Sequence, residues 1–179
     1  LQTFVYRKEL LSGSLYLENN VDDTLPFKIL NEINFDKLTE MIEKEDPGNS
    51  ILVSIYFLIV KTYNNHFDDK NYNKLKGLII DNRKKLDFQS VKYLLFNLQV
   101  INTMRFNEGR KEYEKELYEI SKMLIDGKYY DSDNNWFRAS HFRAILKLGL
   151  SLGDFDYIEQ FVKNYSKRLE PDLRNPLKH

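Results

Sequence analysis

The sequence contains no cysteine, and this absence argues against several classes of protein at once. Without thiols the chain has no disulfide framework, no thiolate metal site and no cysteine nucleophile. A reducing compartment, the cytoplasm above all, is therefore favoured as the location, and no signal-peptide pattern is visible. Because the chain opens on Leu1 within a stretch that already has helical character, we expect it to be a fragment or a processed product.

Glycine and proline are also scarce, with 7 and 4 residues among 179. A fold of many strands needs frequent tight turns, which these residues supply, so their scarcity favours long helices. The chain length and the 42% hydrophobic content suffice for a substantial core. The predicted fold class is therefore all-α.

Neither an excess of charge nor a long apolar run is present. Lysine and arginine together number 27, the same as aspartate and glutamate, so no net field favours nucleic acid or an anionic membrane. The longest apolar run, Ile51 to Val60, is about half of the roughly 20 residues that cross a bilayer. We expect no nucleic-acid partner, no membrane insertion and, because no phosphate-binding loop or catalytic motif is recognisable, no cofactor and no enzyme activity.

What the sequence does contain is apolar residues at helical spacing, three or four positions apart. This spacing predicts a central helix over Ile51–Tyr63, an amphipathic helix after it, and a third helix that begins at an Asp87 N-cap. A further helix follows the turn at Asn107–Gly109. That helix is expected to end at Asp126–Gly127, where the glycine would take the left-handed conformation.

A last pair of helices is predicted on either side of the Gly153–Asp154 turn, the first from about Trp136 to Leu152 and the second ending before Pro171. A first pair is predicted within Phe4–Leu17 and Pro26–Lys44, with Ser12–Ser14 and Ile33–Asp36 as the steps where either helix can break. The predicted hairpins cover residues 1–46, 49–86, 88–126 and 135–170. Their starts are about 40 residues apart, which is typical of helical repeats whose stacked units bury faces that one pair cannot cover.

The segment Leu148–Tyr157, followed by Phe161, Tyr165 and Pro171, resembles the turn and second helix of a tetratricopeptide repeat. Within it, Gly153–Asp156 corresponds to the family's turn of glycine, acidic, aromatic and acidic residues. The resemblance implies an irregular α-α solenoid, with one helical-repeat domain over residues 1–179 that is part of a longer array. It also implies a concave surface, lined by the first helix of each pair, where proteins or peptides bind.

The segment departs from the family at three positions. Ile158 and Tyr165 stand where the family has small residues, and Phe142 occupies the tryptophan position of the first helix. We expect these larger side chains to push the helices apart and loosen the array. The longer segment Phe137–Arg174 resembles a recurring piece of bacterial proteins that carry such repeats.

Aromatic and cationic residues are mixed most densely at the start of the last hairpin, a composition that is typical of interaction sites: Trp136, Phe137, Arg138, His141 and Arg143. The alternative interpretation is structural, with Trp136 covering the hydrophobic seam and the arginines merely solvated.

The repeat alignment places Arg143 and Lys147 on the inner face of this hairpin, with Gln99 and Thr103 at equivalent positions one hairpin earlier. Cations along such a groove suit a peptide with acidic groups, although ordinary exposed polarity explains the same residues. The predicted partner-binding residues are Gln99, Thr103, Trp136, Arg138, His141, Arg143 and Lys147.

The function that we expect is a non-enzymatic scaffold segment for a protein or peptide partner, with self-association through exposed terminal hairpins as an additional outcome. The alternative is a ligand-sensing or enzymatic accessory domain that recognises an anionic small molecule. Its binding residues would be Arg138, His141 and Arg143.

Two segments have the beginnings of a metal site. Asp131–Asn135 opens like a calcium loop, but Trp136 stands where the loop needs glycine and Phe142 where it needs glutamate. Capping of the following helix by Asp133 or Asn134 is the favoured role. His66 precedes two aspartates but has no partner histidine nearby, so no metal is predicted there either.

Overall fold

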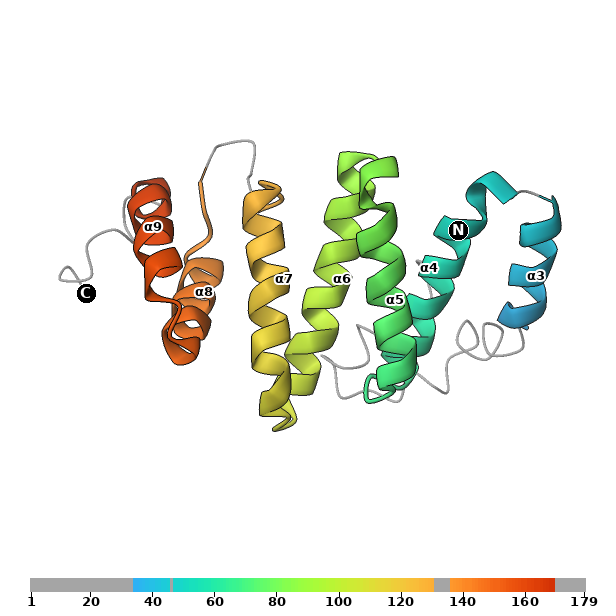
Figure 1. The fold of residues 1–179 in the computed structure, drawn as a ribbon, viewed down its shortest axis with the longest axis horizontal. Coiled ribbons are helices and arrows are strands. Elements are labelled where there is room, and N and C mark those ends of the chain that lie inside the picture. The colour runs from blue at the N-terminus through green and yellow to red at the C-terminus, as the bar shows by residue number, and fades with distance from the viewer. Residues whose placement is uncertain (1–33, 46, 131–135, 170–179) are drawn as a thin grey trace, which may run out of the picture. The chain divides into compact units, whose positions relative to one another are not determined.

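The computed structural model describes residues 34–45, 47–130 and 136–169, and every regular element in these ranges is helical (Figure 1). The seven α-helices are α3 (Phe35–Glu45), α4 (Pro47–Asn64), α5 (Asp69–Asn82), α6 (Phe88–Asn107), α7 (Glu114–Asp126), α8 (Ala139–Leu152) and α9 (Phe155–Tyr165). Short 3-10 helices adjoin three of them: η2 (Arg83–Lys85) directly after α5, η3 (Lys111–Tyr113) directly before α7, and η4 (Ser166–Arg168) directly after α9. The all-α prediction is confirmed for this part of the chain.

The chain divides into two compact units, residues 1–97 and 98–179, and the boundary falls within α6. In the first unit α3 packs against α4, where Leu38 and Ile42 contact the buried Val53 and Val60. The helix α3 begins at Phe35, within the Ile33–Asp36 step where the sequence allows a break, and Asn34 Oδ1 accepts a hydrogen bond from the backbone N–H three residues on at 2.9 Å. Residues 26–33 of the predicted helix lie outside the described residues. The predicted helix over residues 4–17 lies outside the described residues.

The helix α4 also packs against α5, and Val91, Leu94 and Leu95 at the start of α6 are buried residues of the same unit. Ile55 and Ile59 of α4 are fully buried, in agreement with the predicted central position of this helix. The amphipathic helix α5 buries its apolar face through Leu75 and Ile79. The predicted cap of α6 is confirmed, because Asp87 Oδ1 accepts a hydrogen bond from the Ser90 N–H at 2.9 Å.

The second unit contains the rest of α6 with α7, α8 and α9, which follow one another in Figure 1. Its core is the apolar stripe that the sequence predicts for each helix: Leu98, Ile101, Leu117, Ile120, Leu124, Phe142, Ile145, Ile158 and Phe161. The helix α8 contacts both α7 and α9, and Gln99 of α6 is hydrogen-bonded to Ser121 of α7. None of the helices in the described ranges combines the length and hydropathy that a membrane crossing requires.

The end of α7 differs from the prediction. Gly127 has a right-handed φ of −77°, and the left-handed residue is Lys128, with a φ of 57°. A Cβ at Gly127 would overlap the ring of Tyr129, so what the glycine provides here is space. A left-handed lysine is sterically less favourable than a left-handed glycine, and sequence reasoning had no means of finding it.

The start of α8 also differs. The helix begins at Ala139, three residues later than predicted, and its N-cap is Arg138 with an extended backbone, not Asp133 or Asn134. Before it, the Phe137 N–H donates a hydrogen bond of 2.8 Å to the Arg168 carbonyl after α9. This contact holds the chain extended where helical periodicity alone predicts helix.

The α8–α9 turn agrees with its prediction. Gly153 is left-handed with a φ of 74°, and the Asp154 N–H donates to the Gly149 carbonyl at 3.0 Å. The expectation that Ile158 pushes these helices apart is wrong, because its side chain occupies the space that a side chain at Gly149 would fill. The two helices therefore approach closely at this point.

Candidate functional site

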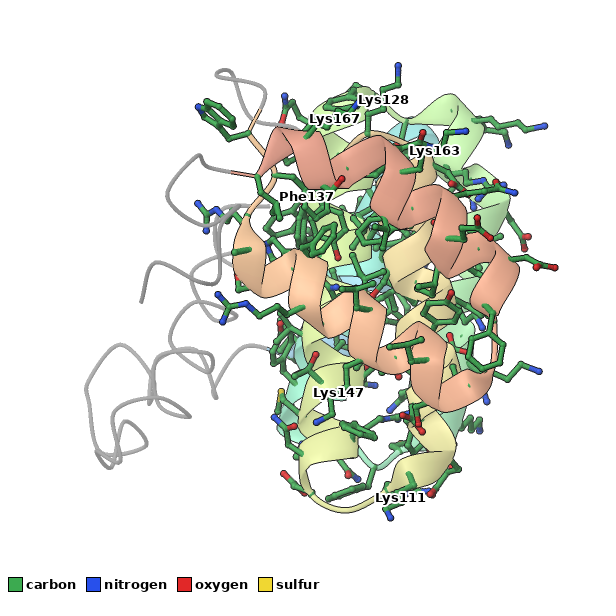
Figure 2. The ribbon with its side chains drawn as sticks, turned by 90° about the vertical axis from the view of Figure 1, so that its left-hand side faces the viewer. Lys111, Lys128, Phe137, Lys147, Lys163 and Lys167 are labelled. Carbon is green, nitrogen blue, oxygen red and sulfur yellow. The ribbon has the colours of Figure 1, made fainter. Side chains whose placement is uncertain are left out.

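The most exposed functional groups of the predicted site are three cations of α8 and its N-cap. Arg138, Arg143 and Lys147 are exposed, and the α8 sequence contains no aspartate or glutamate. Within the described part of the chain none of the three forms an ion pair. We refer to Arg138, Arg143 and Lys147 as the α8 basic face. Figure 2 shows Lys147 at the edge of α8 that points away from α9 and from Phe137.

Beneath this face lies an aromatic cluster centred on Phe137, which is fully buried. Its ring meets those of Tyr130, Phe161 and Tyr165 with centroids 5.5, 5.8 and 4.8 Å apart. Figure 2 shows Phe137 between α8 and α9. The predicted mixture of residues 136–143 is therefore divided: the phenylalanine belongs to the core, and the arginines belong to the surface.

His141 and Gln99 are brought together through Tyr130. The half-buried His141 ring lies 4.6 Å from the Tyr130 ring, centroid to centroid. The Gln99 amide donates one hydrogen bond to the Tyr130 hydroxyl and another, of 3.2 Å, to Ser121 Oγ. Because both of its amide hydrogens are used inside the protein, Gln99 positions Tyr130 and does not present its donors to a partner.

The remaining two predicted residues contribute less to the surface. The Thr103 hydroxyl donates to the Gln99 carbonyl at 2.8 Å, one helical turn back, so its donor is used within α6. Trp136 is half-buried next to Phe137. The structure thus brings together His141 and Gln99 in one network and leaves Arg138, Arg143 and Lys147 as the exposed groups.

Burial sets the charge of the two central rings of this network. It lowers the pKa of His141 below its ordinary 6.5, and the nearby Arg138 guanidinium lowers that pKa further. Burial raises the pKa of Tyr130 to about 12, against the opposing effect of its hydrogen bond from Gln99. Around neutral pH the imidazole is therefore neutral and the phenol is protonated, so the α8 cations carry the charge of the site.

The lowered pKa of His141 predicts a stability that declines in mild acid. The unfolded state takes up this proton at about pH 6.5 and the folded state only at lower pH, so stability is lost as pH falls through that window. Between about pH 7.5 and about pH 5.5, the denaturant midpoint should therefore fall less in the His141→Gln variant than in the original chain. An equal loss in both proteins would contradict the assignment.

A matching NMR titration separates the two causes. Arg138→Gln should raise the His141 midpoint yet leave it below 6.5, because burial is the larger cause and remains in this variant.

A second polar cluster fixes the α8–α9 turn to α7. Asp154 Oδ2 accepts hydrogen bonds from the Tyr118 hydroxyl at 3.2 Å and from Lys122 Nζ at 3.3 Å. The Lys122 ammonium lies 4.8 and 5.2 Å from the ring centroids of Tyr118 and Tyr157. Burial, together with the Asp154 charge, raises the pKa of Tyr118. The acidic residue of the predicted turn therefore has a structural role.

Sequence reasoning missed Ser121 and Tyr130, which complete the network around Gln99. A signal for Ser121 exists, since a serine inside the buried stripe of α7 needs a hydrogen-bond partner, and its hydroxyl donates to the Leu117 carbonyl at 2.8 Å. Tyr130 follows the helix end and gave no periodic signal.

No group of three or more histidine, aspartate or glutamate side chains in the described ranges is arranged to hold a metal ion. The calcium-like segment Asp131–Asn135 lies outside those ranges. The half-buried His66 ring packs against Phe67, with centroids 4.4 Å apart.

Comparison with known proteins finds a partial similarity to a plant enzyme. No protein-family model matches the chain, and no solved structure matches it. The chain is 30% identical over 146 residues to deacetylvindoline O-acetyltransferase from Catharanthus roseus, an alignment that covers 76% of this chain and 31% of that protein. The chain thus spans about a third of the length of this relative, and the similarity does not assign it to a family.

Proposed function

We propose that this chain is an irregular, tetratricopeptide-like helical array that binds an acidic segment of a partner protein and catalyses no reaction. The observation that carries the proposal is the α8 basic face. Three exposed cations lie on or beside one helix of 14 residues that has no acidic residue of its own. Unpaired cations on a fixed helix are ready to form charge-assisted hydrogen bonds with carboxylates.

The packing beneath the face supports this proposal. An interaction surface works best when its anchors are held on a rigid element, because less entropy is then lost on binding. The aromatic cluster around Phe137 and the Tyr118–Asp154 hydrogen bond fix the two ends of α8. The cations therefore project from a helix whose position is set by the core.

The repeat part of the proposal is supported by local geometry. Helices joined by short turns recur in both units, and a left-handed Gly153 forms the turn between α8 and α9. Each such pair leaves one apolar face for a neighbour to cover, as repeat architectures require.

Charge reversal tests the function. The double variant Arg143→Glu, Lys147→Glu should reduce recovery of the partner in quantitative affinity capture by about tenfold or more, because both attractive contacts become repulsive. The matched control is Lys84→Glu, Lys85→Glu, which reverses two exposed lysines of η2 and should leave recovery unchanged. Equal recovery with both variants would contradict the proposal.

A second candidate is recognition of an anionic small molecule by Arg138, His141 and Arg143. The observation that favours it is that the exposed Arg138 guanidinium lowers the pKa of the half-buried His141, which places a cation in the electrostatic neighbourhood of this ring. A ligand at about 100 times its Kd would stabilise the protein by about 2.7 kcal/mol, so a panel of anionic metabolites should raise the melting temperature. The acetyl transfer named for the plant relative is not carried over, because the alignment covers 31% of that protein.

A further inference from the structure

The α8–α9 hairpin has one side that contacts α7 and another that does not. On α9, the Tyr157 ring meets the α7 ring of Tyr118 at 6.0 Å, and Phe161 faces α8 through Phe142, at 5.1 Å. Successive residues of a helix are rotated by about 100° around its axis. Going from Tyr157 past Phe161 in the same direction of rotation, the next apolar residues are Val162 and Phe155, which lie on the side of α9 away from α7. These two residues, seven positions apart, share one face of the helix.

The helix α8 also has an apolar side that faces away from α7. His141 faces Tyr130, and Phe142 faces α9. Leu146 and Leu150 follow in the same rotational direction, again away from the α7 side. We refer to Leu146, Leu150, Phe155 and Val162 as the outer seam.

The outer seam is apolar and open to solvent. Phe155 is 63% exposed, Leu150 53% and Val162 36%, whereas Leu146 is half-buried. Gly149 of α8 contacts Ile158 of α9, and Phe142 of α8 contacts Phe161 of α9. These two contacts fix which residues of the antiparallel helices lie opposite each other, because each step forward along α8 corresponds to a step back along α9. Leu150 and Phe155 therefore form an opposing pair, with Leu146 and Val162 next along the seam. Scattered apolar residues on a surface are ordinary, but a contiguous set marks a contact site.

Basic residues border this seam on both sides. Arg143 and Lys147 are exposed along α8, and Lys163 and Lys167 are exposed along α9 and η4. Figure 2 shows Lys147 at one edge of the hairpin and Lys163 and Lys167 at the opposite edge. Within the described ranges none of these four cations forms an ion pair. The α9 border also carries the exposed acids Asp156 and Glu159, so it holds both signs, whereas the α8 border has no acid and gives the seam its net positive charge.

We propose that the outer seam docks an amphipathic helix with acidic flanks, supplied by the partner protein. The apolar stripe of that helix would cover the opposing Leu150 and Phe155, and its carboxylates would reach the basic borders. From Phe155 to Val162 the seam runs about 10 Å, at 1.5 Å of rise per residue, which matches two turns of a helix. This inference rests on the proposed function, since it names the kind of segment that the basic face receives.

A second copy of this chain is a poorer occupant. Two outer seams placed face to face would set one net-positive patch against another, since a two-fold interface uses the same patch twice. Like charges brought together in this way oppose association. The charge of the seam therefore favours an acidic partner over self-association at this surface.

Three synthetic peptides of about 18 residues, long enough for helix formation, test the proposal by fluorescence anisotropy with the whole chain. One has a leucine stripe with glutamate flanks, the second has the same stripe with lysine flanks, and the third has the glutamate composition in scrambled order. The first should bind at least about tenfold more tightly than the other two, because it alone matches both apolar seam and basic borders. Equal binding of the scrambled peptide would overturn the proposal.

Seam variants give the second arm. Leu150→Ser with Phe155→Ser should weaken the glutamate-flanked peptide at least about tenfold, while Met41→Ser, a residue of α3 that is 54% exposed, should have no effect. Circular dichroism melts establish that each variant is folded. Unchanged peptide binding in the seam variant would overturn the inference, as would a dimer in sedimentation experiments that Phe155→Ser abolishes.

The two proposals fail in different ways. If partner capture is lost with Arg143→Glu, Lys147→Glu but survives Leu150→Ser with Phe155→Ser, the basic face binds without the seam and only the further inference fails. If capture is unchanged in the charge variant, the proposed function itself fails.

Discussion

Phe137→Ala is expected to lower the free energy of unfolding by about 3–5 kcal/mol, the range for truncating a large aromatic in a packed core. The side chain is fully buried and contacts three other rings, from Tyr130, Phe161 and Tyr165. Its loss would leave a cavity between the segment before α8 and the end of α9, since neither can shift without breaking the Phe137–Arg168 backbone hydrogen bond. Denaturant titration followed by circular dichroism measures the change.

Phe155→Ala is the matched control, because it removes the same atoms from a side chain that is 63% exposed. Its expected effect is within about 0.5 kcal/mol, as for most surface substitutions. Similar losses in the two variants would show that Phe137 is not the centre of this core.

Gly149→Ala is expected to cost about 1–3 kcal/mol, although alanine is usually the better helix former. A Cβ at this position would overlap the Ile158 side chain and come within 2.9 Å of the Tyr118 hydroxyl. The helices α7, α8 and α9 meet here, so relieving the overlap requires a shift of Ile158 or of a whole helix. Thermal or denaturant unfolding of the variant measures the cost.

Gly77→Ala is the control with the opposite expected sign. Gly77 lies within α5, and a Cβ built there meets nothing within 4 Å. Alanine should stabilise this helix by about 0.5–1 kcal/mol, because glycine loses more backbone entropy on folding. If Gly149→Ala were also stabilising, the close approach of α8 and α9 would be disproved.

Helical periodicity predicted most of the described fold because local spacing alone decides which face of a helix is buried. The third predicted helix and its Asp87 cap depend on residues within four positions of one another, and both are confirmed. The positions of helix ends were less predictable. Arg138 begins α8 late because Phe137 is hydrogen-bonded to the distant Arg168, a contact that no local pattern contains.

The candidate site was predictable to a similar degree. Exposure of Arg143 and Lys147 follows from the phase of α8, which the sequence contains. The hydrogen bonding of Gln99 could not be predicted from its own helix, because its two hydrogen bonds reach residues 22 and 31 positions away. Its role as a support for Tyr130 therefore required tertiary structure.

Binding of an acidic segment at the α8 basic face is tested most directly by a chemical-shift titration of the whole, isotope-labelled chain with the glutamate-flanked peptide. If the peptide binds at the α8 basic face, the largest backbone shift changes will fall on Arg138, Arg143 and Lys147 and on the α9 residues beside them, with none at the η2 lysines. The contradictory result is a set of changes centred on Lys84 and Lys85, or no changes at a peptide concentration that saturates anisotropy.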